Sequence, residues 1–150
     1  MPATPRPPDP RPPLRDALGA VPVTVLAAVS LGGVIGSLAR YGLLLLLPPE
    51  PGRFDTATFL ANTIGGLLIG AVMVTATEIA PGRRHLRPFL GVGVLGGFTT
   101  FSTYIVGIGR AAAADAVLLA AVYAATTLAA ALAAAALGAW ATRAIGRRLR

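Results

Sequence analysis

Four apolar segments, each long enough to cross a lipid bilayer, constrain the fold of this chain more than any other feature. A membrane-spanning helix needs about 20 predominantly apolar residues. The chain has 150 residues, of which 55% are hydrophobic and only 13% are charged, a composition more apolar than that of an ordinary soluble domain. The sequence therefore predicts an all-α membrane protein with four transmembrane helices at Val21–Leu47, Thr56–Ile79, Leu86–Ile108 and Ala111–Trp140.

Polar segments flank this membrane part. Residues 1–20 are rich in proline and arginine, a composition that builds neither a helix nor a core, and we expect a disordered tail there. The transmembrane domain is expected to cover residues 21–142. A basic C-terminal tail is expected to cover residues 143–150.

The arginines are distributed unevenly over the predicted loops. With four spans, both termini and the loop between the second and third spans lie on one side of the membrane. That side carries most of the arginines, whereas the opposite side carries only Arg53 and Arg110. The positive-inside rule then places both termini in the cytoplasm of a plasma-membrane protein. Because most arginines flank apolar segments, we read the net charge of +7 as a topology signal and expect no nucleic-acid partner.

The third predicted span contains a run, Gly96–Tyr104, that is poorly suited to continue a helix. It begins with two glycines, and two threonines follow after Phe98, and these residue types are weak helix formers. Water cannot satisfy freed backbone groups in a bilayer core. A helix broken at mid-membrane is therefore tolerated only where protein, an ion or a wet cavity receives those groups, and we expect a functional site here.

The run offers ligands for ions of both signs. Carbonyl groups released at a helix break are good ligands for a hard cation such as sodium. A small anion needs several donors in sequence, none of which holds it too tightly. The rings of Phe101 and Tyr104 present edges of partial positive charge, although core packing also explains such aromatics. Hydroxyl donors of the run are Thr99, Thr100, Ser102 and Thr103.

Polar residues inside the other spans each allow two interpretations. Arg40 is either an arginine that reaches the membrane interface or part of a positive vestibule that attracts an anion. Asn62 makes either an interhelical hydrogen bond or an amide contact to an anion. Thr58 lies one turn before Asn62, and Tyr123 and Thr127 are one turn apart, so the four residues could form a polar track.

Small residues recur at the spacing that lets helix backbones approach closely. The pairs are Gly32 with Gly36, Gly66 with Gly70, and Gly93 with Gly97.

Several classes of activity lack the residues that they need. The sequence has no cysteine, nucleophile–base pair, cluster of metal-ligating side chains or phosphate-binding loop, so we expect no enzyme. It also lacks an acidic residue at the centre of a span, which argues against a proton-coupled carrier.

Three motifs together resemble the Fluc (CrcB-type) fluoride channels. They are Gly32–Tyr41, Asn62 with Gly65 and Gly66, and the Gly96–Tyr104 run, and the match extends to Thr127. The resemblance implies four-helix subunits that pair as antiparallel, dual-topology dimers and export fluoride passively from the cytoplasm, which reduces fluoride toxicity.

The resemblance also implies roles for individual residues. Backbone carbonyls of Gly96 and Thr99 would hold a structural sodium ion, which is not transported, at the dimer centre. Arg40 would lie in the vestibule. The fluoride pore would be lined by Asn62, Phe101, Tyr104, Ser102, Thr103, Thr58, Tyr123 and Thr127. The sequence departs from the family pattern at Tyr104, where phenylalanine is common, and at Ala131, where a further hydroxyl is expected.

The sequence leaves alternatives open for both the partner and the function. The strong charge bias suggests that the chain inserts in one orientation and pairs with an oppositely oriented paralogue rather than with itself. A small four-helix multidrug exporter is one alternative function, but it needs a carboxylate that Val21–Leu47 lacks. A membrane scaffold that transports nothing is the other, and it leaves the joint occurrence of Asn62 and the Gly96–Tyr104 run unexplained.

Overall fold

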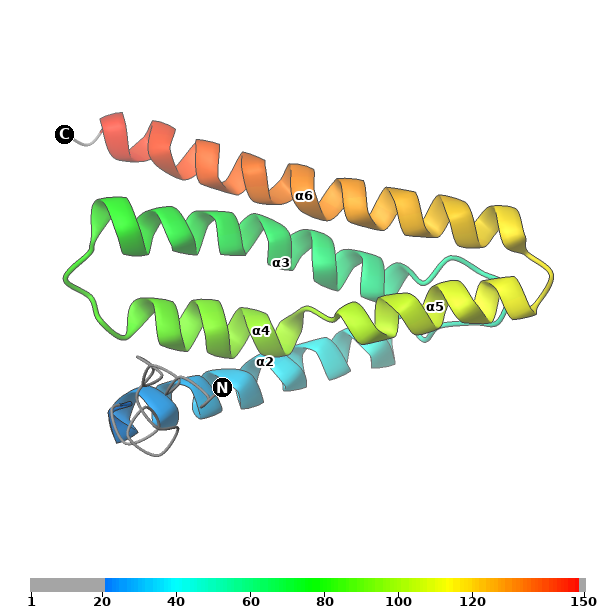
Figure 1. The fold of residues 1–150 in the computed structure, drawn as a ribbon, viewed down its shortest axis with the longest axis horizontal. Coiled ribbons are helices and arrows are strands. Elements are labelled where there is room, and N and C mark those ends of the chain that lie inside the picture. The colour runs from blue at the N-terminus through cyan, green and yellow to red at the C-terminus, as the bar shows by residue number, and fades with distance from the viewer. Residues whose placement is uncertain (1–20, 149–150) are drawn as a thin grey trace, which may run out of the picture.

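The computed structural model describes residues 21–148, and these form only helices and connecting turns (Figure 1). Four helical segments are long and apolar enough to cross a membrane, which confirms the predicted all-α membrane fold. The predicted tail at residues 1–20 lies outside the described residues. The first span is α2 (Val23–Leu46), and the second is α3 (Thr56–Val74) continued by the π-helical turn η1 (Thr75–Ile79). The third span consists of the π-helix η2 (Arg87–Leu95), α4 (Gly96–Phe98) and α5 (Phe101–Ala113). The fourth span is α6 (Val117–Arg148).

The boundary between the third and fourth spans lies further along the chain than the sequence predicted. We expected the third span to end at Ile108 and the fourth to begin at Ala111, but α5 continues to Ala113 and α6 begins at Val117. Alanine is the best helix former, so the alanine-rich sequence here carries no stop signal. The chain turns instead at Asp115, whose φ of 57° is a left-handed conformation that aspartate tolerates better than most residues.

Helix α6 also continues beyond its predicted end. It extends past Trp140 to Arg148, so most of the segment expected as a basic tail is helical. Alanine and arginine both favour the helix, which explains why the helix does not stop at the end of the apolar sequence.

Helices α3 and α6 lie side by side along most of their length (Figure 1). A Cβ atom added at Gly66 or Gly70 would overlap the carbonyl oxygen of Ala131 or Ala135, and Gly138 faces the α3 backbone in the same way. Small residues allow two backbones to come this close, and van der Waals packing then holds the helices together. We call this contact, made by Gly66, Gly70 and Gly138, the glycine seam.

Helix α2 packs against η2 and α4 by the same means. A Cβ at Gly32 or Gly36 would overlap backbone atoms of the third span, and Gly93 and Gly97 face back onto the α2 backbone. The three glycine pairs recognised in the sequence therefore all lie at helix–helix contacts.

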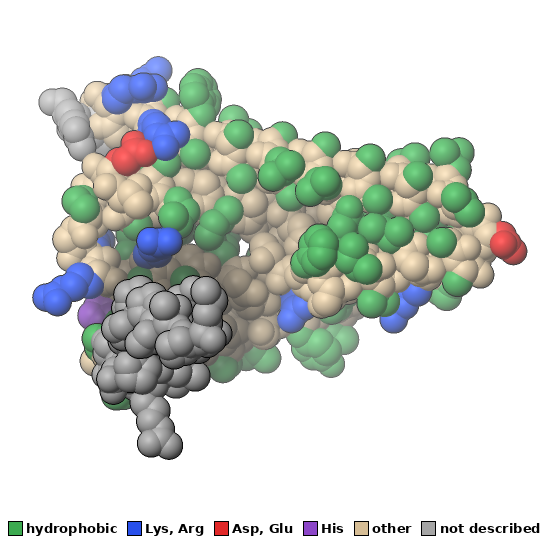
Figure 2. All heavy atoms as spheres, viewed as in Figure 1, with side chains coloured by type: hydrophobic (Ala, Val, Ile, Leu, Met, Phe, Trp, Pro, Cys, Tyr) green, Lys and Arg blue, Asp and Glu red, His purple; other side chains and the backbone are tan. Residues whose placement is uncertain are grey.

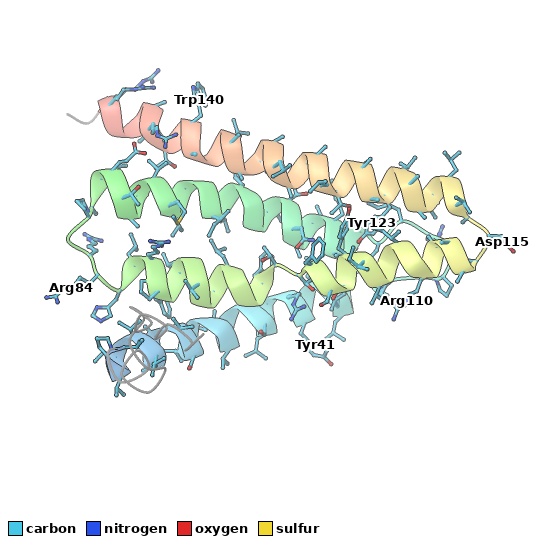
Figure 3. All side chains as sticks on the ribbon, viewed as in Figure 1. Tyr41, Arg84, Arg110, Asp115, Tyr123 and Trp140 are labelled. Atoms are coloured by element: carbon cyan, nitrogen blue, oxygen red, sulfur yellow. The ribbon has the colours of Figure 1, made fainter. Side chains whose placement is uncertain are left out.

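Large apolar side chains cover the outside of the described helices (Figure 2). Leu38, Leu118 and Leu132 are each more than half exposed. An apolar surface of this extent is unfavourable in water but suits contact with lipid chains. Arginines gather at the end of the bundle where α6 finishes, with Arg84 at that end and Asp115 at the other (Figures 2 and 3).

Candidate functional site

Two residues of extended backbone separate α4 from α5. Thr99 has φ and ψ of −81° and 159°, and Thr100 has −151° and 126°. The Thr100 hydroxyl accepts a hydrogen bond from the Thr103 N–H at 3.2 Å and so caps α5. We call these two residues the interruption.

Asn62 of α3 binds the interruption through both ends of its amide. Its Nδ2 donates to the Thr100 carbonyl at 2.9 Å, and its Oδ1 accepts from the Thr100 N–H at 2.9 Å. The two bonds satisfy backbone groups that no helix would pair. Of the two interpretations that the sequence allowed, the interhelical hydrogen bond is the one that this geometry displays.

The hydrogen bonds at the interruption leave two carbonyl groups without their helical donors. In a continuous helix the N–H groups of Thr100 and Thr103 would donate to the carbonyls of Gly96 and Thr99. Here the first N–H donates to Asn62 and the second to the Thr100 hydroxyl. The carbonyls of Gly96 and Thr99 are thus free of their helical donors, and a Cβ added at Gly96 would meet open space.

A groove of about 570 Å³ opens beside the interruption. Its lining combines polar groups of the interruption with an apolar wall from α3 and α6. The groove brings together six residues to which the family resemblance assigns a role: Gly96, Thr99, Asn62, Phe101, Tyr104 and Thr127.

The two aromatics of the run differ sharply in exposure. The Phe101 side chain is 74% exposed, whereas Tyr104 is 9% exposed, although their ring centroids are only 5.7 Å apart. The Tyr104 hydroxyl donates to the Ala124 carbonyl of α6 at 2.9 Å. The hydroxyl by which Tyr104 departs from the family pattern therefore donates its proton to the protein backbone.

Two hydroxyls of α6 are buried without a hydrogen-bond partner among the described residues. They belong to Tyr123 and Thr127, and the Tyr123 ring lies 5.7 Å from the Tyr104 ring. Figure 3 shows Tyr123 pointing between the helices. The sequence analysis missed a third such hydroxyl, that of Thr63 on α3. Unpaired buried hydroxyls are costly, so each marks a place where a ligand or water has polar atoms to bind.

Thr58 is placed differently from the other track residues. Its hydroxyl donates to the Asp55 carboxylate at 2.8 Å, and its N–H donates to the same carboxylate at 3.0 Å. Asp55 is 7% exposed and caps α3. The sequence analysis missed Asp55, although an aspartate directly before an apolar helix is a recognised cap signal.

The remaining predicted residues lie outside the lining of the groove. Ser102 is exposed, and its Oγ is 3.3 Å from the Thr100 hydroxyl, while the Thr103 hydroxyl accepts from the Thr100 hydroxyl at 3.1 Å. Arg40 is half-buried on α2, one turn beyond Gly36, and no carboxylate within residues 21–148 forms an ion pair with it.

No cluster of histidine, aspartate or glutamate suited to a metal ion occurs in the part of the chain that the structure describes. Uncharged oxygen atoms remain as ligands for a cation at this site, and the backbone carbonyls of Gly96 and Thr99 are among them.

Comparison with known proteins decides the family. Residues 27–139 match the family model described as CrcB-like protein, Camphor Resistance (CrcB). This chain belongs to the CrcB-like family. The resemblance drawn from the three motifs is thereby confirmed.

Three similar proteins are each named as a fluoride-specific ion channel. The chain is 49% identical over 99 residues to fluoride-specific ion channel FluC 2 of Streptomyces avermitilis, which covers 66% of this chain and 63% of that protein. It is 44% identical to FluC 1 of Streptomyces coelicolor over 81% of this chain and 79% of that protein. It is 46% identical to FluC 2 of Nocardia farcinica over 82% of this chain and 91% of that protein. Relatives named as ion channels confirm that this CrcB-like chain is no enzyme.

Proposed function

We propose that this chain is a subunit of a fluoride-selective channel that lets fluoride leave the cytoplasm passively. The observation that carries the proposal is the groove beside the interruption, found in a chain whose similar curated proteins are named fluoride-specific ion channels. With a negative-inside potential, exit of an anion is favoured by about 2.3 kcal/mol per 100 mV. No energy source is then required.

The residues around the groove suit a small, strongly hydrated anion. Ring edges of Phe101 and Tyr104 attract an anion weakly, and the unpartnered hydroxyls of Tyr123 and Thr127 can replace water molecules one at a time. Conduction needs sites that are favourable enough to enter and weak enough to leave. Ser102 and Thr103 would add hydroxyls beside the rings, Asn62 would hold the interruption in shape, and Arg40 would raise the local anion concentration.

A second chain would complete the pore. Phe101 is largely exposed and the space beside Gly96 is open, so the groove has a wall missing in one subunit. We propose an antiparallel dimer in the plasma membrane, either with itself or, as the arginine bias favours, with an oppositely oriented paralogue. In this chain both termini would face the cytoplasm.

A structural sodium ion fits the dimer centre chemically. Sodium is a hard cation that prefers oxygen ligands, and the carbonyls of Gly96 and Thr99 lack their helical donors. With two such carbonyls from each subunit, the ion would join the two interruptions without being transported.

Fluoride efflux from liposomes tests the proposal. Purified protein is reconstituted alone and with a paralogue, valinomycin balances the charge, and a fluoride electrode records release beside a chloride control. The proposal predicts rapid fluoride release with no matching chloride release. Release only with the paralogue would establish the heterodimer, and functional antiparallel homodimers of this chain alone would contradict it. Failure of folded protein to release fluoride in either case would overturn the proposed function.

A further inference from the structure

A row of aromatic rings leads from the groove to the loop between α2 and α3. Tyr104 lines the groove and its ring centroid is 5.7 Å from that of Tyr123. The Phe54 ring, in turn, meets the Tyr123 ring edge to face at 5.1 Å. Beyond Phe54 lies a second hollow of about 420 Å³, which also contacts Glu50 and Arg53. An anion that leaves the groove along Tyr123 would therefore pass Phe54 on its way out.

Asp55 places a buried carboxylate beside this row. It directly follows Phe54 in the chain, and its residue is 7% exposed. The two ion pairs within residues 21–148 join Arg53 to Glu50 and Arg143 to Glu78, so neither neutralises Asp55. Its charge is supported instead by the α3 N-terminus and by two hydrogen bonds from Thr58.

The carboxylate also determines what the Thr58 hydroxyl can do. An ionised carboxylate only accepts hydrogen bonds, so the single hydroxyl proton of Thr58 is committed to Asp55 Oδ2 at 2.8 Å. Thr58 is 2% exposed and lies one turn from Asn62 towards the loop. Its hydroxyl can offer a passing anion only lone pairs, which repel it.

We propose that Asp55 limits anion passage at the loop end of the polar track, by its fixed negative charge and by taking the Thr58 proton out of the track. Asp55 is then a positioning and rate-determining residue in addition to a helix cap. The inference rests on the proposed function, because it concerns the rate of fluoride movement.

The substitution Asp55→Asn separates this role from capping. Asparagine caps helices about as well as aspartate, so the fold is retained. Its Oδ1 can accept from the Thr58 N–H, while its Nδ2 donates to the Thr58 hydroxyl oxygen and frees the hydroxyl proton for the track. We expect fluoride efflux from liposomes to increase by about fivefold or more, with an unchanged midpoint of thermal unfolding.

Two further variants separate the contribution of the freed Thr58 donor from that of the charge at this end of the bundle. Asp55→Asn combined with Thr58→Val removes the freed donor but keeps the neutral cap, and its efflux should fall between those of wild type and Asp55→Asn. The matched control is Asp115→Asn, because Asp115 is exposed in the turn between α5 and α6 at the same end of the bundle, and asparagine also tolerates its left-handed backbone conformation. We expect efflux of this control to equal that of wild type, since exposed charges are screened.

The outcomes distinguish the inference from the proposed function. Equal efflux for wild type and Asp55→Asn, both folded and conducting, would overturn the inference and leave the channel intact. A folded wild type that releases no fluoride would overturn the proposed function and the inference with it. An increase for Asp115→Asn as large as for Asp55→Asn would assign the effect to general surface charge and contradict the specific role of Asp55.

Discussion

The glycine seam and the groove are built on the same helix, yet the seam is closely packed whereas the groove contains polar atoms without a partner. In the seam, Gly66 and Gly70 of α3 bring backbone against backbone, and no room is left for a side chain. One to two turns earlier on α3, Asn62 meets an interrupted backbone and the groove begins. The seam therefore supplies stability through close packing, whereas the groove keeps unpaired carbonyls and hydroxyls at a cost in stability.

The largest effect is expected from removal of the amide that supports the interruption. Asn62→Ala leaves both the N–H and the carbonyl of the partly buried Thr100 without their partner, and an unpaired group costs up to about 1–3 kcal/mol when it is fully buried. We expect a loss of thermal stability and of fluoride efflux, measured on the same purified sample. Full stability of this variant would show that the interruption does not depend on Asn62.

The seam provides the next largest effect. Gly70→Ala places a Cβ on the Ala135 carbonyl, and the backbone shift that follows should cost about 1–3 kcal/mol. Gly33→Ala is the matched control, because its Cβ would meet no atom within 4 Å and alanine favours the helix by up to about 1 kcal/mol. The midpoint temperature of thermal unfolding should thus fall for Gly70→Ala and rise for Gly33→Ala. Equal shifts would contradict the close contact between α3 and α6.

Removal of an unpaired hydroxyl should separate stability from function. Thr127→Val has nearly the same shape but lacks the buried oxygen that has no partner. We expect equal or higher thermal stability, because an unsatisfied group is removed, and a fall in fluoride efflux of about tenfold, equivalent to about 1.4 kcal/mol. Unchanged efflux would place the anion path away from Thr127.

The smallest effect is expected at Tyr104. Tyr104→Phe removes only the hydrogen bond to the Ala124 carbonyl, which contributes about 1 kcal/mol, and leaves the ring edge in place. Thermal stability should decrease slightly. Efflux should stay within about threefold of wild type, because a change of well under 1.4 kcal/mol in the barrier alters a rate by less than about tenfold. A large loss of efflux would mean that the hydroxyl itself contacts the permeating anion.

The sequence predicted the fold well because its signals are local. Apolar length identified four spans, and glycine spacing identified the helix contacts made by Gly32, Gly36, Gly66 and Gly70. The turn at Asp115 and the end of α6 were misplaced. At the turn, the flanking alanines favour a helix equally on both sides, and no local pattern decides where the chain turns.

The candidate site was predicted less completely because its geometry depends on contacts between distant residues. The Gly96–Tyr104 run contains the released carbonyls, but the sequence could not reveal that Asn62 would bind Thr100. Such a pairing follows from how α3 lies against α5 and from which groups remain without a partner after packing. The contact between Asp55 and Thr58, by contrast, spans only three residues, and the cap signal in the sequence could have revealed it.

Fluoride efflux by Phe101→Ile, compared with wild type in liposomes of the same composition, tests most directly whether the groove conducts fluoride. Phe101 is 74% exposed in the subunit, so the subunit fold should tolerate the change, and thermal unfolding with size-exclusion chromatography checks that the protein remains folded and assembled. Because the aliphatic side chain lacks the partially positive ring edge, the account predicts rapid fluoride release by wild type and almost none by the variant. Equal release by both proteins would contradict it.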